Sequence, residues 1–133
     1  MLTTRGRLVW VNQTILDQAD FFQSNNFSRV AGLSVTDLTG KVFHNNVPMG
    51  WTLSNGTTVT ESQVTSGHLY FHEITGAPGY YSVRFRPNNT GYWRILLSYA
   101  AGEQILAQDY DVLAEPTVSG GLRASVTSNT SCR

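Results

Sequence analysis

The sequence predicts an all-β domain built as an antiparallel sandwich. Between Leu33 and Leu113, short runs of alternating apolar and polar residues follow one another, which is the pattern of half-buried strands. Clusters of Gly, Pro, Asn and Asp separate these runs, as turns do in all-β proteins. The chain has 133 residues, enough for one domain with a core of its own.

The alternation predicts which side of each strand faces the core. The clearest strands are predicted at residues 38–43, 68–74, 80–86, 92–99 and 105–113. Within 80–86, Tyr81, Val83 and Phe85 point one way, while Ser82 and the arginines point the other. By the same alternation, Trp93 and Tyr110 fall on the core side of the last two strands.

Turn residues predict how the strands connect. Pro87 ends the strand before it because proline cannot donate to a sheet ladder. The Asn55-Gly56 pair predicts a hairpin, since both residues accept positive φ. About seven short strands joined by tight turns are typical of an immunoglobulin-like antiparallel β-sandwich. A small barrel is the alternative.

The pattern weakens towards both ends of the chain, which predicts three parts. Residues 1–30 form an N-terminal arm, 31–113 the sandwich and 114–133 a C-terminal tail rich in Ser, Thr and Gly. Within the arm, residues 13–24 have near-helical spacing and are interpreted as one or two helical turns or as irregular chain. Residues 7–11 could instead add an edge strand to the sandwich.

Composition argues against several classes of partner. Nine Lys and Arg balance nine Asp and Glu, so neither the basic footprint of a nucleic-acid binder nor a polybasic membrane patch is present. The one cysteine, Cys132, cannot form an internal disulfide, and the first residues lack the apolar stretch of a signal peptide. We therefore expect a protein made in a reducing cytoplasm, with no nucleic-acid or membrane partner.

No motif indicates catalysis, a metal or a cofactor. His68 and His72 share one face of a predicted strand but lie about 13 Å apart, too far to hold one ion. The acidic residues show no paired spacing suited to acid–base chemistry, and no phosphate-binding or nucleophile motif occurs. We therefore expect a protein that is not an enzyme and has no cofactor.

Some polar and aromatic residues are candidates for binding. Arg84, Arg86 and Arg94 fall on the predicted outer faces of strands taken as adjacent, where they would form a small basic patch or simply a polar sheet face. Trp51 at a loop edge would serve as a sugar-stacking platform in a glycan-binding module. The alternative is that Trp51 packs beneath its own loop.

The segments "GLSVTDLTGKVFHNN" and "EITGAPGYYSVRFRPNNTGYWRILLSY" resemble a module that recurs in tailed-bacteriophage structural proteins, and the second is similar to filamin-type immunoglobulin repeats. The match covers about residues 32–112. The residues that carry the resemblance are Gly32, Leu33, Val35, Asp37, Leu38, Lys41, Glu73, Ile74, Gly79, Tyr81, Val83, Phe85, Pro87, Gly91 and Trp93.

The resemblance implies a virion structural protein present in many copies per particle. Its first interpretation is a capsid decoration (cement) protein on the outer shell, with the major capsid protein as partner. The arm would bridge capsid subunits and bury Leu8, Trp10, Phe21 and Phe22. A tail, baseplate or head–tail accessory protein and a glycan-binding module are the alternatives, and a homo-oligomer is left open.

Overall fold

The computed structural model describes residues 6–23, 28–99 and 104–114, which form a β-sandwich. The predicted tail from residue 115 onward, with Cys132, lies outside this description. The described strands are β1 (Arg7–Trp10), β2 (Ile15–Ala19), β3 (Thr39–His44), β4 (Val47–Met49), β5 (Thr52–Asn55), β6 (His68–Glu73), β7 (Tyr81–Phe85), β8 (Gly91–Tyr99) and β9 (Gln104–Leu113). Two short 3₁₀ turns are added, η1 (Val35–Asp37) and η2 (Glu61–Gln63), and no helix in the described part could span a membrane.

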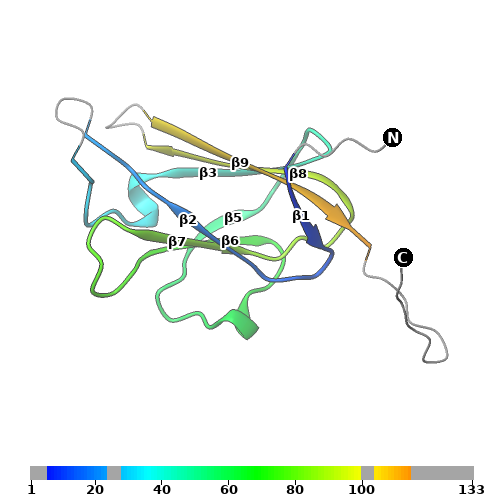
Figure 1. Ribbon diagram of the computed structural model, residues 1–133, viewed down its shortest axis with the longest axis horizontal. Coiled ribbons are helices and arrows are strands. Elements are labelled where there is room, and N and C mark those ends of the chain that lie inside the picture. Colours follow the sequence, from blue (N-terminus) through cyan, green and yellow to red (C-terminus); the bar gives the residue numbers. More distant parts are fainter. Residues whose placement is uncertain (1–5, 24–27, 100–103, 115–133) are drawn as a thin grey trace, which may run out of the picture.

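The strands form two sheets packed face to face (Figure 1). One sheet has the order β1-β9-β8-β3-β4, and the other has the order β2-β7-β6-β5. Most neighbours are antiparallel, while β1 with β9 and β5 with β6 are parallel. The fold class predicted from the sequence, an all-β sandwich, is confirmed, with nine described strands instead of about seven.

The strand connections pass repeatedly from one sheet to the other. The chain changes sheets between β1 and β2, β2 and β3, β4 and β5, and β7 and β8, while β3–β4 and β8–β9 are hairpin neighbours within one sheet. Between β7 and β8, the Trp93 indole donates to the carbonyl of Asn89 at 2.9 Å.

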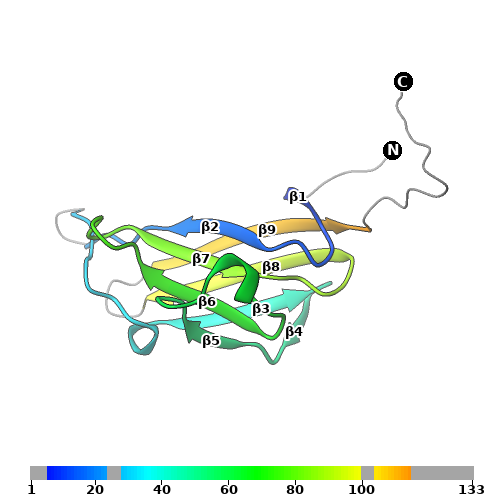
Figure 2. The ribbon, with the colours of Figure 1, turned by 90° about the horizontal axis from the view of Figure 1, so that it is seen from below.

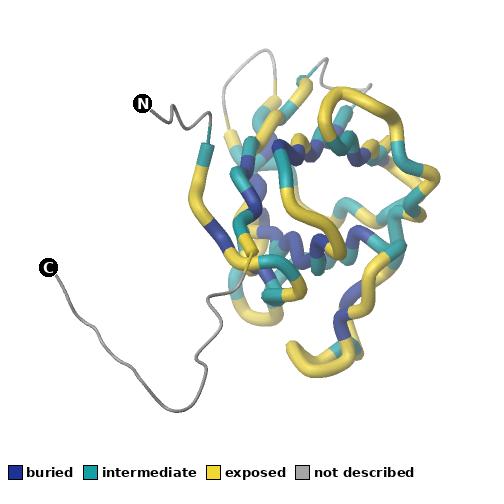
Figure 3. The backbone as a smooth tube through the Cα atoms, turned by 90° about the vertical axis from the view of Figure 1, so that its right-hand side faces the viewer, coloured by how far each residue is buried: buried dark blue, intermediate teal, exposed yellow. Residues whose placement is uncertain are grey.

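The core lies between the sheets and is rich in aromatic rings. Buried positions alternate with more exposed ones along both layers (Figure 3). Trp93, Tyr81, Phe71 and Phe85 are all at most 1% exposed. The rings of Phe71 and Tyr81 stack at 5.0 Å, a separation at which aromatic pairs add to the stabilisation from burial. The predicted inward faces of 80–86, 92–99 and 105–113 are therefore confirmed.

The N-terminal segment differs from the predicted arm. Residues 7–10 pair with the end of β9, and Ile15–Ala19 pairs along the whole of β7. Val9, Ile15, Ala19 and Phe21 belong to the core. The sandwich therefore begins near residue 7 and not near residue 31, and residues 13–24 contain a strand where the spacing had indicated helical turns.

The connection after β5 also differs from prediction. The hairpin occurs at Asn45 and Asn46, which both have positive φ and join β3 to β4. Asn55-Gly56 instead starts a crossover, residues 56–67, because β5 and β6 are parallel and no tight turn can join parallel strands.

Arg84 of β7 anchors this crossover. Its guanidinium donates to the carbonyls of Gly56 and Val59 at 2.6 and 2.5 Å, and the residue is only 8% exposed. Val64, in the same crossover, is fully buried. The crossover thus covers part of the outer face of the four-stranded sheet.

Candidate functional site

One lateral side of the sandwich gathers exposed apolar side chains. Six large apolar residues are exposed among the described residues, and four of them, Leu8, Trp10, Leu16 and Ile105, lie on β1, β2 and β9. These three strands run along the upper side in Figure 2, while β4 and β5 run along the lower side. We call these the β1–β2–β9 side and the β4–β5 side. By strand alternation, Leu8, Trp10 and Ile105 project from the five-stranded sheet, whereas Leu16, opposite Arg84, projects from the outer face of the four-stranded sheet. Exposed apolar side chains on β1 and β9 make this side a candidate contact surface.

The apolar surface of β1 is the most structured part of this side. Leu8 and Trp10 are 55% and 42% exposed, while Val9 between them is buried against the core. Together with Leu113 of β9 they line a groove of about 180 Å³. Two large apolar side chains beside a groove can bury substantial area against a protein partner.

The backbone of β1 is protected at its free edge. The amide of Trp10 donates to the Gln13 side-chain oxygen at 2.8 Å, and the carbonyl of Trp10 accepts from the Gln13 amide at 3.1 Å. Because both backbone groups of Trp10 have partners, contacts at this point depend on side chains and not on added strand pairing.

A polar cluster joins the two sheets beneath β1. Asp17 of β2 accepts a hydrogen bond from the Tyr110 hydroxyl and lies 3.8 Å from the Arg7 guanidinium. Burial and the neighbouring carboxylate raise the pKa of Tyr110 well above its ordinary value, so its hydroxyl stays a donor throughout the physiological range. This cluster holds the edges of β2 and β9 together at one point.

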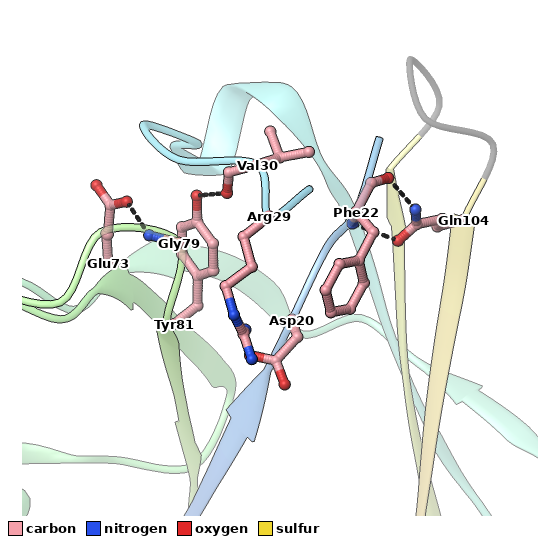
Figure 4. A network of polar contacts seen from close by, with 8 residues as sticks. All are labelled: Asp20, Phe22, Arg29, Val30, Glu73, Gly79, Tyr81 and Gln104. Carbon is pink, nitrogen blue, oxygen red and sulfur yellow. Dashed lines mark hydrogen bonds and ion pairs between the residues drawn. The ribbon is translucent and has the colours of Figure 1, made fainter. Parts of the chain in front are cut away.

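A second link closes the same side near the start of β9. The Gln104 side chain accepts from the amide of Phe22 at 3.1 Å and donates to the carbonyl of Phe22 (Figure 4). Between the two links lies a small cavity of about 40 Å³, lined by both strand edges and by core residues such as Val83. The side is therefore tied at two points and open between them.

The loops beyond Phe22 form a tightly bonded end of the sandwich (Figure 4). Arg29 pairs with Asp20 at 2.7 Å, and its guanidinium lies 3.8 Å from the centre of the Tyr80 ring. Glu73 accepts from the amides of Gly79 and Gly32, which lowers the pKa of its carboxyl group. These bonds connect the described residues near Arg29 with the turn between β6 and β7.

The four arm residues that were predicted to contact partners differ in exposure, and they form one exposed pair and one pair that is buried or half-buried. Leu8 and Trp10 are exposed on β1, as a contact role requires. Phe21 is fully buried against Phe71, Tyr81 and Tyr99, so its predicted contact role is wrong. Phe22 is half-buried, and the Arg29 guanidinium lies 5.3 Å from the centre of its ring.

Trp51 does not present a flat exposed ring. It packs against the core, with ring centroids 5.3 Å from Trp93 and 6.5 Å from Phe85. A stacking platform for a sugar needs one free ring face on the surface, and this packing favours the alternative that Trp51 is part of the core margin.

The three arginines do not form one patch. Arg84 is buried beneath the crossover, which corrects its predicted outward contact role. Arg86 donates to the Thr14 hydroxyl at 2.8 Å. Arg94 lies on the other sheet, where it forms a two-point pair with Asp109 at 2.7 and 3.1 Å. The strands that carry them, β7 and β8, are in different sheets, which the sequence did not indicate.

The histidines take separate roles. His68 bonds to the Ser54 hydroxyl at 3.0 Å, and His72 lies 3.5 Å from the Arg84 guanidinium. Within the ranges that the structure covers, no group of three His, Cys, Asp or Glu residues is arranged to hold a metal ion.

Sequence reasoning missed three residues of the β1–β2–β9 side: Leu16, Ile105 and Leu113. Ile105 was in phase with Ala107 and Asp109, on the outward face of its strand. A large apolar residue on a polar face was the signal that could have found it.

The chain was also compared with known proteins. No protein-family model matches it, and no curated protein matches it significantly.

Proposed function

We propose that this protein is a non-enzymatic structural protein of a tailed-phage virion, and that it decorates the outer face of the capsid shell. The observation that carries the proposal is the pair of exposed apolar side chains on β1, Leu8 and Trp10, which line a groove with Leu113. A domain that presents most of its exposed large apolar side chains on one side is suited to docking on a fixed surface.

Two further observations support a role in a multi-copy assembly. The resemblance of residues 32–112 to modules of phage structural proteins supplies the class of particle. Net charge is zero, so copies placed close together on a symmetric shell do not repel one another strongly. Repeated weak contacts on such a shell add up through multivalency.

Leu8 and Trp10 are proposed to make the main contact with the major capsid protein. Both side chains project from a strand whose own backbone is fixed by β9 and by Gln13. A rigid apolar pair loses little side-chain freedom on docking, which favours affinity.

The test measures binding of the purified protein to empty shells assembled from the major capsid protein of the same genome. Wild type should co-sediment with shells to a fixed ratio, and Leu8→Ser with Trp10→Ser should weaken binding at least about tenfold. Thermal unfolding of the double variant verifies that it remains folded.

Val47→Ser is the matched control, because Val47 is 59% exposed and lies on β4, on the opposite side. Unchanged shell binding by the double variant would remove β1 as the contact. No binding by wild type to shells would overturn the capsid location, and binding to isolated tails or baseplates would then support the accessory-protein alternative.

A further inference from the structure

We propose that the open edge of β9 pairs with the same edge of a second copy of this chain, forming a two-fold dimer with one continuous sheet. The inference does not require the proposed function, because the pairing involves this chain alone.

Among the described residues, the first half of β9 has no strand paired along the edge that faces away from β8. Its partner β1 covers Tyr110–Leu113 only. Gly6, the described residue before β1, donates its amide to the Asp111 carboxylate at 2.9 Å and lies against the backbone of Asp109. Within the part of the chain that the structure covers, no strand pairs with residues 104–108 on this side.

The direction of the backbone groups follows from the existing ladder. The Val11 amide donates to the carbonyl of Leu113 at 2.8 Å, so the backbone groups of Leu113 face the β1 side. Because alternate residues of a strand direct these groups to the same side, those of Ile105 and Ala107 also face it. Two amides and two carbonyls are thereby presented along the open edge.

These four groups are self-complementary. In an antiparallel pairing with the two-fold axis at Leu106, Ile105 lies opposite Ala107 of the second copy. On the other side of the axis, Ala107 lies opposite Ile105 of the second copy. Each such pair exchanges two hydrogen bonds, so the dimer gains four. The pairing uses residues 104–108 of each copy and stops short of Gly6 and β1.

The side chains suit this arrangement. Ile105 is 70% exposed, the largest exposure of any large apolar residue that the structure describes, and it would pack against Ala107 of the second copy. Residues 104–108, Gln-Ile-Leu-Ala-Gln, carry no charge, so the two edges meet without repulsion.

The second strand would extend an interface that β9 already forms with β1, along the same edge. The cavity beneath this edge is only about 40 Å³. That volume admits a small group and no large side chain. The space therefore fits a strand laid alongside β9 better than a side chain inserted between the sheets.

The test is sedimentation equilibrium of the full chain from about 1 μM to about 1 mM, the range expected of a small interface. Wild type should change from monomer to dimer across this range. Ala107→Pro removes an amide that faces the open edge, and it leaves the hydrogen bonds between β9 and β8 in place. It should therefore raise the dissociation constant of the dimer at least about tenfold.

Ala107→Thr is the control, because it keeps the amide and suits a strand, and it should dimerise like wild type. If Ala107→Pro proves unfolded by circular dichroism, Ile105→Lys replaces it, since it sets two like charges across the interface. Equal dimerisation by a folded Ala107→Pro or Ile105→Lys variant would show that another surface is used, and the proposal would be wrong.

The register is tested in a Cys132→Ser background with a short thiol cross-linker. A mixture of Ile105→Cys and Ala107→Cys chains should form the mixed cross-linked dimer in excess over either like pair. Excess of a like pair would overturn the register. If the wild type stays monomeric over the whole concentration range, the dimer proposal is wrong. If the chain dimerises only after residues 1–5 are removed, those residues occupy the edge of β9 in the intact protein.

Discussion

The two lateral sides of the sandwich differ in the length of their edge strands and in how far those edges are paired. On the β4–β5 side the edge strands have only three and four residues, and β4 contains Pro48, which cannot donate to another strand. On the β1–β2–β9 side, β9 runs for ten residues and only its second half is paired with β1.

The comparison indicates which side is built for contact. Short strands and proline are the usual means by which a protein prevents edge-to-edge association. The β1–β2–β9 side has such protection at Trp10, where Gln13 occupies the backbone groups, whereas no other described strand pairs with β9 at Ile105 and Ala107 on this side. This difference between the two sides supports the contacts proposed above for the β1–β2–β9 side.

The largest effect should come from removing the strands of the β1–β2–β9 side. Deletion of residues 1–22 takes away Val9, Ile15, Ala19 and Phe21 from the core. The loss should exceed about 5 kcal/mol, comparable with the whole stability of a small domain, so the variant should be unfolded. Circular dichroism and amide dispersion in NMR spectra measure this directly.

An independent arm would give the opposite result. In that case the shortened chain would keep a cooperative unfolding transition and lose only its attachment to a partner. A folded deletion variant would therefore restore the boundary near residue 31 that the sequence had predicted.

A smaller effect is expected on the outer face of the four-stranded sheet. Arg84→Ala removes the donors to Gly56 and Val59 and leaves two carbonyls beneath the crossover without them. We expect a loss of about 3 kcal/mol in the free energy of unfolding, measured by urea denaturation.

The matched control is Arg94→Ala, because Arg94 forms an exposed pair with Asp109 on the other sheet. Exposed ion pairs contribute little, so its unfolding midpoint should be close to that of wild type. Equal loss in the two variants would mean that Arg84 does not anchor the crossover.

The smallest effect concerns the pH dependence of the same region. Burial, and then the neighbouring Arg84 guanidinium, lower the pKa of His72 below its ordinary value. The unfolded chain therefore binds a proton more readily than the folded one, and this contribution to stability is present above about pH 6.5 and lost as the pH falls below it.

The thermal unfolding midpoint of wild type should accordingly fall between about pH 7.5 and about pH 5.5, and His72→Gln should reduce that fall. The measurement is a pair of thermal unfolding series across this range. An identical fall in the two proteins would assign the pH dependence to other groups.

The sequence predicted much of the fold because the strand period of two is a local property. Tyr81, Val83 and Phe85 lie on the core face as expected, and so do Trp93 and Tyr110. No knowledge of neighbouring strands was needed for these assignments, since alternation alone places successive side chains on opposite faces.

The N-terminal error has a physical cause. Ile15 and Ala19 are four residues apart, and this spacing fits one face of a helix and one face of a strand equally well. The pairing of β2 with β7 decided between them, and that pairing joins residues far apart in sequence. Local pattern could not have supplied it.

The site was harder to predict than the fold for a related reason. Alternation placed Arg84 on the outer face correctly but could not show that the crossover covers it. Leu8 and Trp10 were identified as contacts, but the open edge at Ile105 and Ala107 depends on where β1 stops along β9. Exposure results from the assembled sheets, so it cannot be read from a single strand.

The pairing of β1 with β9 also has a consequence for synthesis. β1 leaves the ribosome long before β9, and it must wait for β9 because Arg7 pairs with Tyr110. Contacts between residues so distant in sequence slow folding, typically to milliseconds or seconds. Until β9 emerges, β1 lacks the strand with which it pairs in the folded protein. Translation rate and chaperones should therefore affect the yield of this protein more than that of a domain whose first strands pair with each other.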